Sequence, residues 1–306
     1  MDVIRVVQFL HPGPEHGWDR AFTTTTGWKD WNRGDHKRKF LVAEGSCTRN
    51  PRESPARGSF TFWGEWEPQS EVRRLVSNKG AHYPSWLHTP RLRLSEVASP
   101  PKQNGQMQAC ALDLLQNTDP LVFGDRFRYA LCRQFSNVSG LPTALARLHE
   151  GDIILFGSNV AGCFALDTVF VVGVFSPVSS DYPLPKWESE LHRRITMDLF
   201  EIPRCGLRLY GGQNWSAEKP FSFVPCLPID RLSRDFSRPI IEPSGVLSNL
   251  ISPKLKQNFK ITVLDGARTA RLVWDAVVQQ VLAHGCALGT NVEEPADARG
   301  QLYEAD

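Results

Sequence analysis

The chain has 306 residues, of which 41% are hydrophobic and 22% are charged, and its formal net charge is +2. This composition is typical of a folded globular protein and excludes wholesale disorder. A net charge so close to zero also excludes a uniformly basic chain, so any site for nucleic acid must be a local patch.

The cysteines and the apolar runs further restrict the class of protein to which the chain can belong. The seven cysteines are scattered and contain no CxxC pair, which argues against a zinc knuckle, a thioredoxin-type site and a disulfide scaffold. We therefore predict neither a metal nor another cofactor. No apolar run reaches the roughly 18 residues of a membrane span, and the apolar run at the N-terminus is too short for a signal peptide. We expect a cytoplasmic protein that has no membrane partner.

The first element and the loop after it carry the residues best suited to catalysis. Residues 2–10, DVIRVVQFL, predict a buried strand, and the loop HPGPEHGWD follows directly. In this loop His11, Glu15 and His16 lie close together, and the prolines forbid the helix that an HExxH zinc motif needs. Imidazole and carboxylate groups suit acid–base catalysis or metal binding; the alternative is that they only order the loop. These three are our candidate catalytic residues.

A polar loop and an aromatic strand come next. Residues 46–58 are polar and contain two prolines, which predicts a flexible loop. Residues 59–67 alternate, so a strand there would place Phe60 and Phe62 on one face and Trp63 on the other.

We predict that residues 117–175 form the structural centre of the chain. It opens with a turn and the loop GDRFRY, in which Arg126, Arg128 and Tyr129 stand together. Arginine binds phosphate through two parallel hydrogen bonds or stacks on a base, so these three are candidate ligand-binding residues. The alternative is a loop in which Asp125 neutralises one of the arginines.

A helix and two buried strands follow within this stretch. The apolar spacing predicts a helix over residues 141–149 and strands over 153–158 and 164–175. Asp167 falls inside the second strand, and a buried carboxylate needs a partner. It is either paired with a nearby arginine or reads a ligand.

The order of these elements resembles the PUA-like superfamily, in particular its EVE, ASCH and YTH-type domains. The matching residues are Leu145 and Leu148, the turn Gly151-Asp152, and the strands Ile153–Phe156 and Val169–Gly173. The resemblance implies a small β-barrel with a pocket for modified bases or RNA. The chain lacks the Tyr-Trp signature that opens EVE domains, so no pocket residue is carried over.

The C-terminal half predicts a hairpin and a long helix. Residues 207–225 suggest two strands separated by Gly211-Gly212, with side chains near the break that suit adenine recognition: Tyr210, Gln213, Asn214 and Trp215. The alternative is a wide hairpin covered by its tryptophan. A shorter helix is predicted over 188–199, and a clear one over 269–284, where Gly285 supplies a stop signal.

Taken together, these patterns predict an α+β fold. It is mixed and strand-rich, with a PUA-like β-barrel core, a few peripheral helices and long loops. No clean linker appears, so residues 1–288 are predicted to form a single domain with its core around residues 117–228. The acidic residues of 289–306 predict a disordered tail.

Three functions remain open. The first is a module that binds nucleic acid or a nucleotide, including a reader of modified bases, with RNA, DNA or a nucleotide as its partner. The second is an enzyme acting on such a ligand, with acid–base groups from the HPGPEH loop. The third is a protein-interaction domain.

Overall fold

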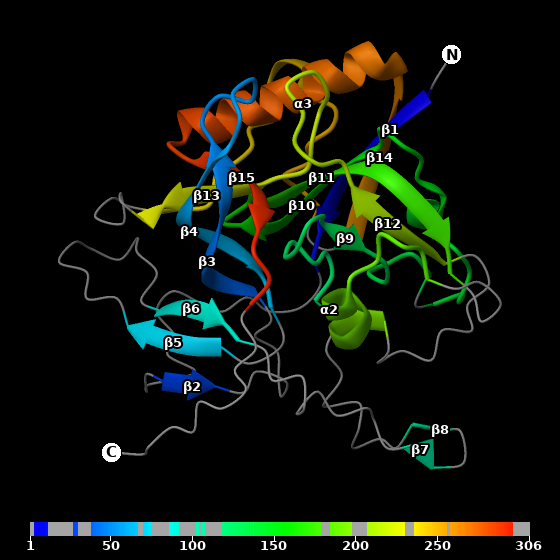
Figure 1. Ribbon diagram of the computed structural model, residues 1–306. Helices are drawn as coiled ribbons and strands as arrows, with labels where there is room; N and C mark the ends of the chain where they lie inside the picture. Colours follow the sequence, from blue (N-terminus) through cyan, green and yellow to red (C-terminus); the bar gives the residue numbers. More distant parts are fainter. Residues whose placement is uncertain are drawn as a thin grey trace.

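The computed structural model describes residues 3–11, 27–29, 38–66, 70–74, 86–91, 102–103, 106–107, 118–136, 138–178, 184–197, 207–229, 236–255 and 258–295. Within these ranges the chain is rich in strands and poor in helices, arranged as two large sheets and a two-stranded one (Figure 1). This confirms the predicted α+β class.

The first sheet is built around a parallel pair of strands. Its strands in spatial order are β14 (Asn258–Asp265), β1 (Val3–Leu10), β10 (Ile153–Val160), β11 (Cys163–Pro177), β12 (Arg208–Gly212) and β9 (Arg128–Tyr129). Strands β1 and β10 are parallel, with Leu10 opposite Gly157, and the other pairs are antiparallel. Nearly all apolar side chains of β1, β10 and β11 are buried, so both faces of these strands are covered.

The second sheet is more open. Its strands in spatial order are β15 (Ala287–Val292), β13 (Val224–Pro228), β4 (Ala56–Glu65), β3 (Arg38–Thr48), β6 (Trp86–Pro90), β5 (Ser70–Arg74) and β2 (Gly27–Lys29). Strand β15 also pairs with β3, but the sheet is not a closed barrel, so the predicted PUA-like barrel is not confirmed. The small sheet joins β7 (Lys102–Gln103) and β8 (Gln106–Met107).

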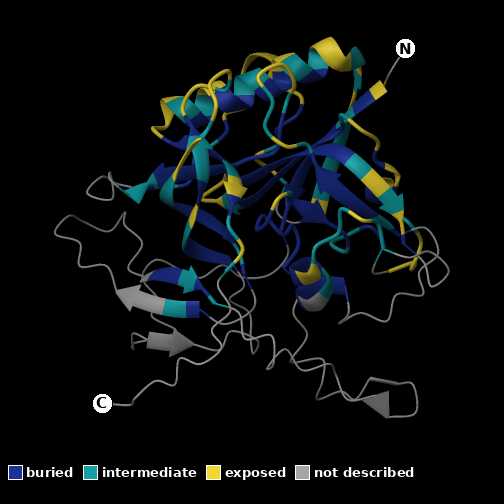
Figure 2. Cartoon of the chain, viewed as in Figure 1, coloured by how far each residue is buried: buried dark blue, intermediate teal, exposed yellow. Residues whose placement is uncertain are grey.

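The long helix α3 (Gly266–Ala283) lies across the sheets at the top of Figure 1. Its outer side is exposed, whereas an apolar stripe on its inner side is buried (Figure 2). The stripe lies within the helix predicted over residues 269–284 and consists of Ala270, Val273, Trp274, Val277, Val278 and Val281. Trp274 anchors it, because its Nε1–H donates to the Phe221 carbonyl at 3.0 Å. Gly285, at φ +94°, follows the helix as predicted.

The other described helical segments are short. They are the 3₁₀ turns η1 (Ala144–Arg147) and η4 (Gly245–Leu247), and α2 (Glu190–His192) continuing into the π-helical η2 (Arg193–Met197). The predicted helix over 141–149 is therefore wrong except for one turn. Pro142 disfavours helical backbone at Leu141, which is 66% exposed, and the hydroxyl of Thr143 caps the turn.

Two predicted loops are partly strand. Residues 46–48 belong to β3 and residues 56–58 to β4, and these strands pair as far as Cys47 with Ala56, so the loop is shorter than predicted. Backbone pairing at a hairpin end needs no apolar side chains, so the polar composition concealed it. Likewise, the tail predicted to be disordered from residue 289 begins as β15, which pairs on both sides. Residues 296–306 lie outside the described residues.

The predicted glycine hairpin is also wrong. Gly211 and Gly212 belong to β12, which pairs with β11 and β9, while β13 lies in the other sheet. A Cβ on Gly211 would come within 2.7 Å of Arg126 Cδ and of a Val174 methyl. These glycines therefore allow close packing inside a strand and do not form a turn.

We expect replacement of Trp274 by alanine to lower the free energy of unfolding by about 3–5 kcal/mol, because it leaves a cavity and removes a buried hydrogen bond. Denaturant unfolding followed by circular dichroism measures this. The control is Leu272→Ala on the outer side of α3, where Leu272 is 50% exposed and a change within about 0.5 kcal/mol is expected. Equal effects of the two variants would contradict the packing of α3 described above.

Candidate functional site

A group of polar side chains is buried where the ends of several strands meet. We call it the His11 cluster, and it consists of His11, Arg38, Glu65, Ser158, Asp167 and Arg238. These residues come from the end of β1, the start of β3, the end of β4, β10, β11 and the segment after residue 235. His11, Arg38, Ser158, Asp167 and Arg238 are all less than a tenth exposed.

Strand pairing positions the members of the cluster. His11 follows the last paired residue of β1, and its backbone N–H donates to the Gly157 carbonyl at 3.1 Å. Arg38 and Glu65 lie directly opposite each other in the antiparallel β3–β4 pair, so their side chains share a face. Residues from distant parts of the chain therefore meet at one end of the two sheets.

The pair Asp167 and Arg238 is the most strongly tied part of the cluster. The Nη2 group of Arg238 donates to Asp167 Oδ1 and, at 2.7 Å, to Ser158 Oγ. The guanidinium carbon also lies 4.7 Å from the centroid of the Trp63 ring, a cation–π contact. This confirms the interpretation of Asp167 as a carboxylate paired with an arginine.

His11 is held as a neutral imidazole. Burial lowers its pKa well below 6.5, and the positive charges of Arg38 and Arg238 lower it further. The Oε2 atom of Glu65 lies 3.6 Å from Nδ1 of His11, beyond hydrogen-bond range, and does not reverse the effect. A neutral imidazole keeps a ring nitrogen lone pair that can accept a hydrogen bond or a proton, and the neighbouring cations make it a weaker base than a solvated histidine.

Of the candidate catalytic residues, only His11 can be placed. Glu15 and His16 lie outside the described residues. Among the residues that are described, no group of three His, Cys, Asp or Glu side chains is arranged to hold a metal ion.

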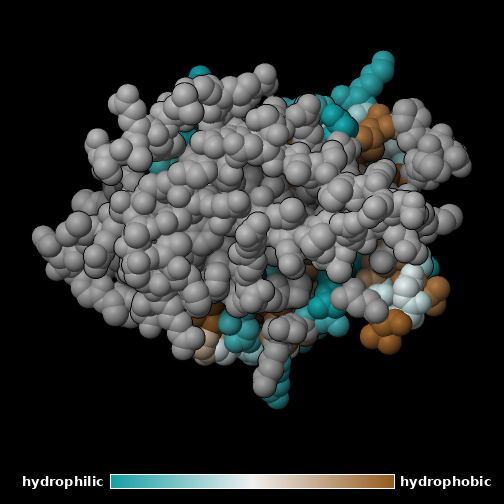
Figure 3. All heavy atoms as spheres, turned by 90° about the horizontal axis from the view of Figure 1, so that it is seen from below, coloured by the Kyte–Doolittle hydropathy of each residue, from teal (hydrophilic) through white to brown (hydrophobic). Residues whose placement is uncertain are grey.

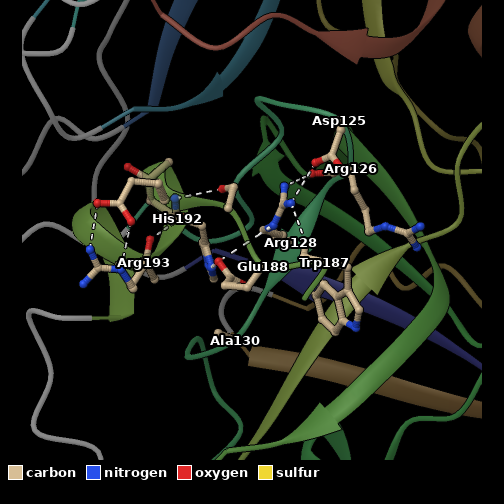
Figure 4. A network of polar contacts seen from close by, with 12 residues as sticks. Asp125, Arg126, Arg128, Ala130, Trp187, Glu188, His192 and Arg193 are labelled. Atoms are coloured by element: carbon tan, nitrogen blue, oxygen red, sulfur yellow. Dashed lines mark hydrogen bonds and ion pairs between the residues drawn. The ribbon is translucent and has the colours of Figure 1, made fainter. Parts of the chain in front are cut away.

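The GDRFRY loop leads into a second buried network, shown in Figure 4. Arg128 is 1% exposed and donates to Asp125 Oδ1 and to the carbonyls of Arg126 and Trp187, at 2.6–2.7 Å. Its Nε lies 3.8 Å from Oε1 of Glu188. The hydrogen bonds of Arg128 thus join β9 to the segment before α2, which gives it a structural role.

Figure 4 continues from Glu188 to His192, whose Nδ1 lies 2.7 Å from the Glu188 carboxylate. The side chains of both residues are buried. Nearby, Asp119 accepts three backbone N–H groups, from residues 130–132 at 2.6–2.9 Å. Burial still raises the pKa of Asp119. The sequence did not predict this network, because a single polar residue in a loop gives no indication of whether its side chain is buried.

Both candidate tyrosines are fully buried. The Tyr129 hydroxyl donates to the Cys132 carbonyl at 2.5 Å, and the Tyr210 hydroxyl donates to the Leu145 carbonyl at 2.8 Å. Burial raises the pKa of both phenols, that of Tyr210 to about 12. Their rings stack at 5.7 Å, so they serve the core and present no surface to a ligand.

The remaining ligand-binding candidates lie nearer the surface. Arg126 points away from Arg128 in Figure 4 and donates to the Gly212 carbonyl at 3.1 Å. Gln213 and Trp215 are half-buried, and Asn214 is exposed. Trp215 packs against the core cluster that includes the buried side of α3, and there is no hairpin for it to cover because β12 and β13 lie in different sheets. The structure therefore brings Arg126 to Gly212, the residue before Gln213, but Tyr129, Tyr210 and Arg128 are buried and do not join a ligand site there.

Comparisons with family models, with curated proteins and with solved structures found no match to this chain. The PUA-like resemblance therefore stays a prediction. Within the described part of the chain, no helix combines the length and the apolar character needed to cross a membrane.

Breaking the Asp167–Arg238 pair tests the cluster energetically. Arg238→Met leaves the Asp167 carboxylate buried without its cation, so we expect the free energy of unfolding to fall by about 3–5 kcal/mol. The double variant Arg238→Met/Asp167→Leu removes both charges and should recover most of this loss. A double variant no more stable than the single one would show that the pair is not the source of the effect. Denaturant unfolding of the three proteins measures this.

The neutral state of His11 gives a pH dependence. Because its folded pKa lies below the unfolded value of 6.5, the unfolded chain takes up a proton first as the pH falls. The contribution of His11 to stability is therefore complete above about pH 6.5 and is lost below it, by up to about 1.4 kcal/mol per pH unit. Compared with wild type, His11→Gln should lose less stability between about pH 7 and about pH 5. Equal losses, measured by denaturant unfolding at both pH values, would contradict the neutral buried imidazole.

Proposed function

We propose that the protein binds a nucleotide or nucleic acid through phosphate groups at the His11 cluster. The main support is that His11 and Arg38, which come from separate segments, are buried in one place, where burial and the charges of Arg38 and Arg238 lower the pKa of His11. Planar guanidinium groups match the oxygens of a phosphate, and charges in a poorly solvated site act more strongly than they do in water.

The cluster is a better candidate than the segment predicted from the sequence. Arg128 uses its donors on protein oxygens, and Tyr129 and Tyr210 are buried against each other. Rebuilding a site from these side chains would leave buried polar groups without partners, which is costly. The neutral imidazole of His11, in contrast, has no hydrogen bond to its ring nitrogens among the described residues.

An enzyme acting on such a ligand is the second candidate. Its support is the position of Glu65 Oε2, 3.6 Å from Nδ1 of His11, since a nearby carboxylate stabilises an imidazole that takes up a proton. In this alternative His11 is the general base and Arg38 holds the phosphate.

A protein-interaction domain has less support. The large exposed apolar side chains of the described residues are spread over several elements: for example, Val138 and Leu141 share one turn, while Phe175, Val263 and Leu272 lie on β11, β14 and α3. From below, hydrophobic atoms of the coloured residues also lie in separate groups (Figure 3). A docking face usually presents a continuous apolar patch.

The test is a binding screen with free nucleotides and with single- and double-stranded RNA and DNA, at two salt concentrations. We expect at least one ligand to bind more tightly at the lower salt. Arg38→Lys keeps the charge but loses the planar fork, so it should weaken that binding about tenfold. The control is Asn214→Ala on the exposed segment, which should leave the affinity unchanged.

Two results would overturn the proposal. One is the absence of binding to every ligand at the lower salt. The other is weaker binding in Asn214→Ala together with unchanged binding in Arg38→Lys, which would return the site to the segment around Gln213. For the enzyme alternative, His11→Gln should retain the ligand and lose its turnover.

A further inference from the structure

A pocket of about 360 Å³ lies away from the His11 cluster, along one edge of β3. Its lining includes Val42, Glu44, Arg91, Phe123, Glu293 and Glu294. This volume falls in the range of small-molecule sites, which is roughly 300–1,000 Å³.

The pocket is a gap in the second sheet. On this edge of β3, strand β6 pairs at Leu41 and strand β15 pairs only from Gly45 onward. Between them, Val42 and Ala43 have no strand partner on this side among the described residues. The chain leaving β15 closes the gap through the hydrogen bond from the Glu293 N–H to the Glu44 carbonyl, at 2.8 Å. The pocket is thus built into the strand pairing.

The charged side chains that line the gap differ in whether they form ion pairs. Arg91 is paired with Glu71 at 2.6 Å, so its positive charge is already balanced. Glu293 is paired with Arg57 at 2.6 Å. The carboxylates of Glu44 and Glu294 make no ion pair within the described part of the chain. The pocket therefore presents two carboxylates that lack a direct ion pair, and the positive charge of Arg128 acts on that of Glu294 from outside the pocket lining.

Apolar groups form much of the rest of the wall, namely Val42, Ala43, Phe123 and two prolines, Pro90 and Pro295. Partial burial raises the pKa of Glu294, which a bound cation would lower again. An ion with a complete hydration shell would gain nothing from apolar walls, whereas an alkyl chain would.

We propose that this pocket binds a short aliphatic diamine or polyamine, whose ammonium groups face Glu44 and Glu294 and whose methylene chain lies against Val42 and Phe123. The carboxylates attract the ammonium groups, and the apolar walls favour a ligand with an alkyl chain over a metal cation. This site is independent of the function proposed for the His11 cluster.

The probe is putrescine, titrated by calorimetry into the full chain. Two compounds serve as controls: the corresponding uncharged diol, which keeps the chain and loses the charges, and magnesium chloride, which keeps the charge and loses the chain. We expect putrescine to bind and neither control to displace it. Raising the salt concentration should weaken binding, because the carboxylates face solvent on one side.

Charge-matched variants locate the site. Glu44→Gln/Glu294→Gln should weaken putrescine binding about tenfold or more, since both ammonium–carboxylate contacts are lost. The matched control Glu218→Gln/Glu242→Gln removes the same charge from exposed positions outside the pocket and should bind as wild type does.

Three outcomes would overturn the proposal: no heat of binding with putrescine, equal loss of binding in both double variants, or displacement of putrescine by magnesium at equal ionic strength. Thermal unfolding of each variant without ligand checks that it is folded. Because nucleotide binding is measured with different variants, failure here leaves the proposed function untouched.

Discussion

Strand β1 is the element on which the rest of the structure depends. It pairs in parallel with β10 and in antiparallel with β14, and so joins the start of the chain to its middle and to its C-terminal third. Its side chains alternate between two cores: Ile4, Val6 and Leu10 face one, while Val7 and Phe9 face the other. A slip of one residue would exchange these sets. Because both faces are buried, the register of β1 is fixed from both sides, and with it the position of His11.

The buried polar groups show how the fold accommodates charge. Asp167 has Arg238, Asp119 has three backbone N–H groups, and Arg128 has two carbonyls and a carboxylate. Each arrangement offsets a desolvation cost of several kcal/mol per ion by direct bonds. His11 differs, because it avoids the cost by staying neutral. A group that is neutral and carries no strong internal bond remains available for other chemistry.

The sequence predicts local elements better than their assembly. The strands β1, β10 and β11 and the helix α3 follow from apolar periodicity, and their buried residues agree with it. The separation of β12 from β13 into two sheets does not follow, since it depends on pairing between segments far apart in sequence. The type of a residue also does not show whether its side chain is buried or exposed. Arg38 stands between two lysines in the sequence, yet it is 3% exposed.

The same limit explains why the GDRFRY loop and Tyr210 looked like a ligand site. Arginine and tyrosine bind ligands with the groups that they also use to tie a protein together. In a sequence the two uses are identical, because both need planar donors and aromatic rings. They separate only when the partners are known. The N–H groups of Arg128 donate to oxygen atoms of the protein itself. The glycines of β12 let Arg126 and Phe127 pack closely against that strand. Side chains whose hydrogen bonds hold the fold together cannot reorganise around a ligand without losing those bonds. A reactive group that makes no strong bond to the protein, such as the imidazole of His11, is therefore the better candidate for a binding site.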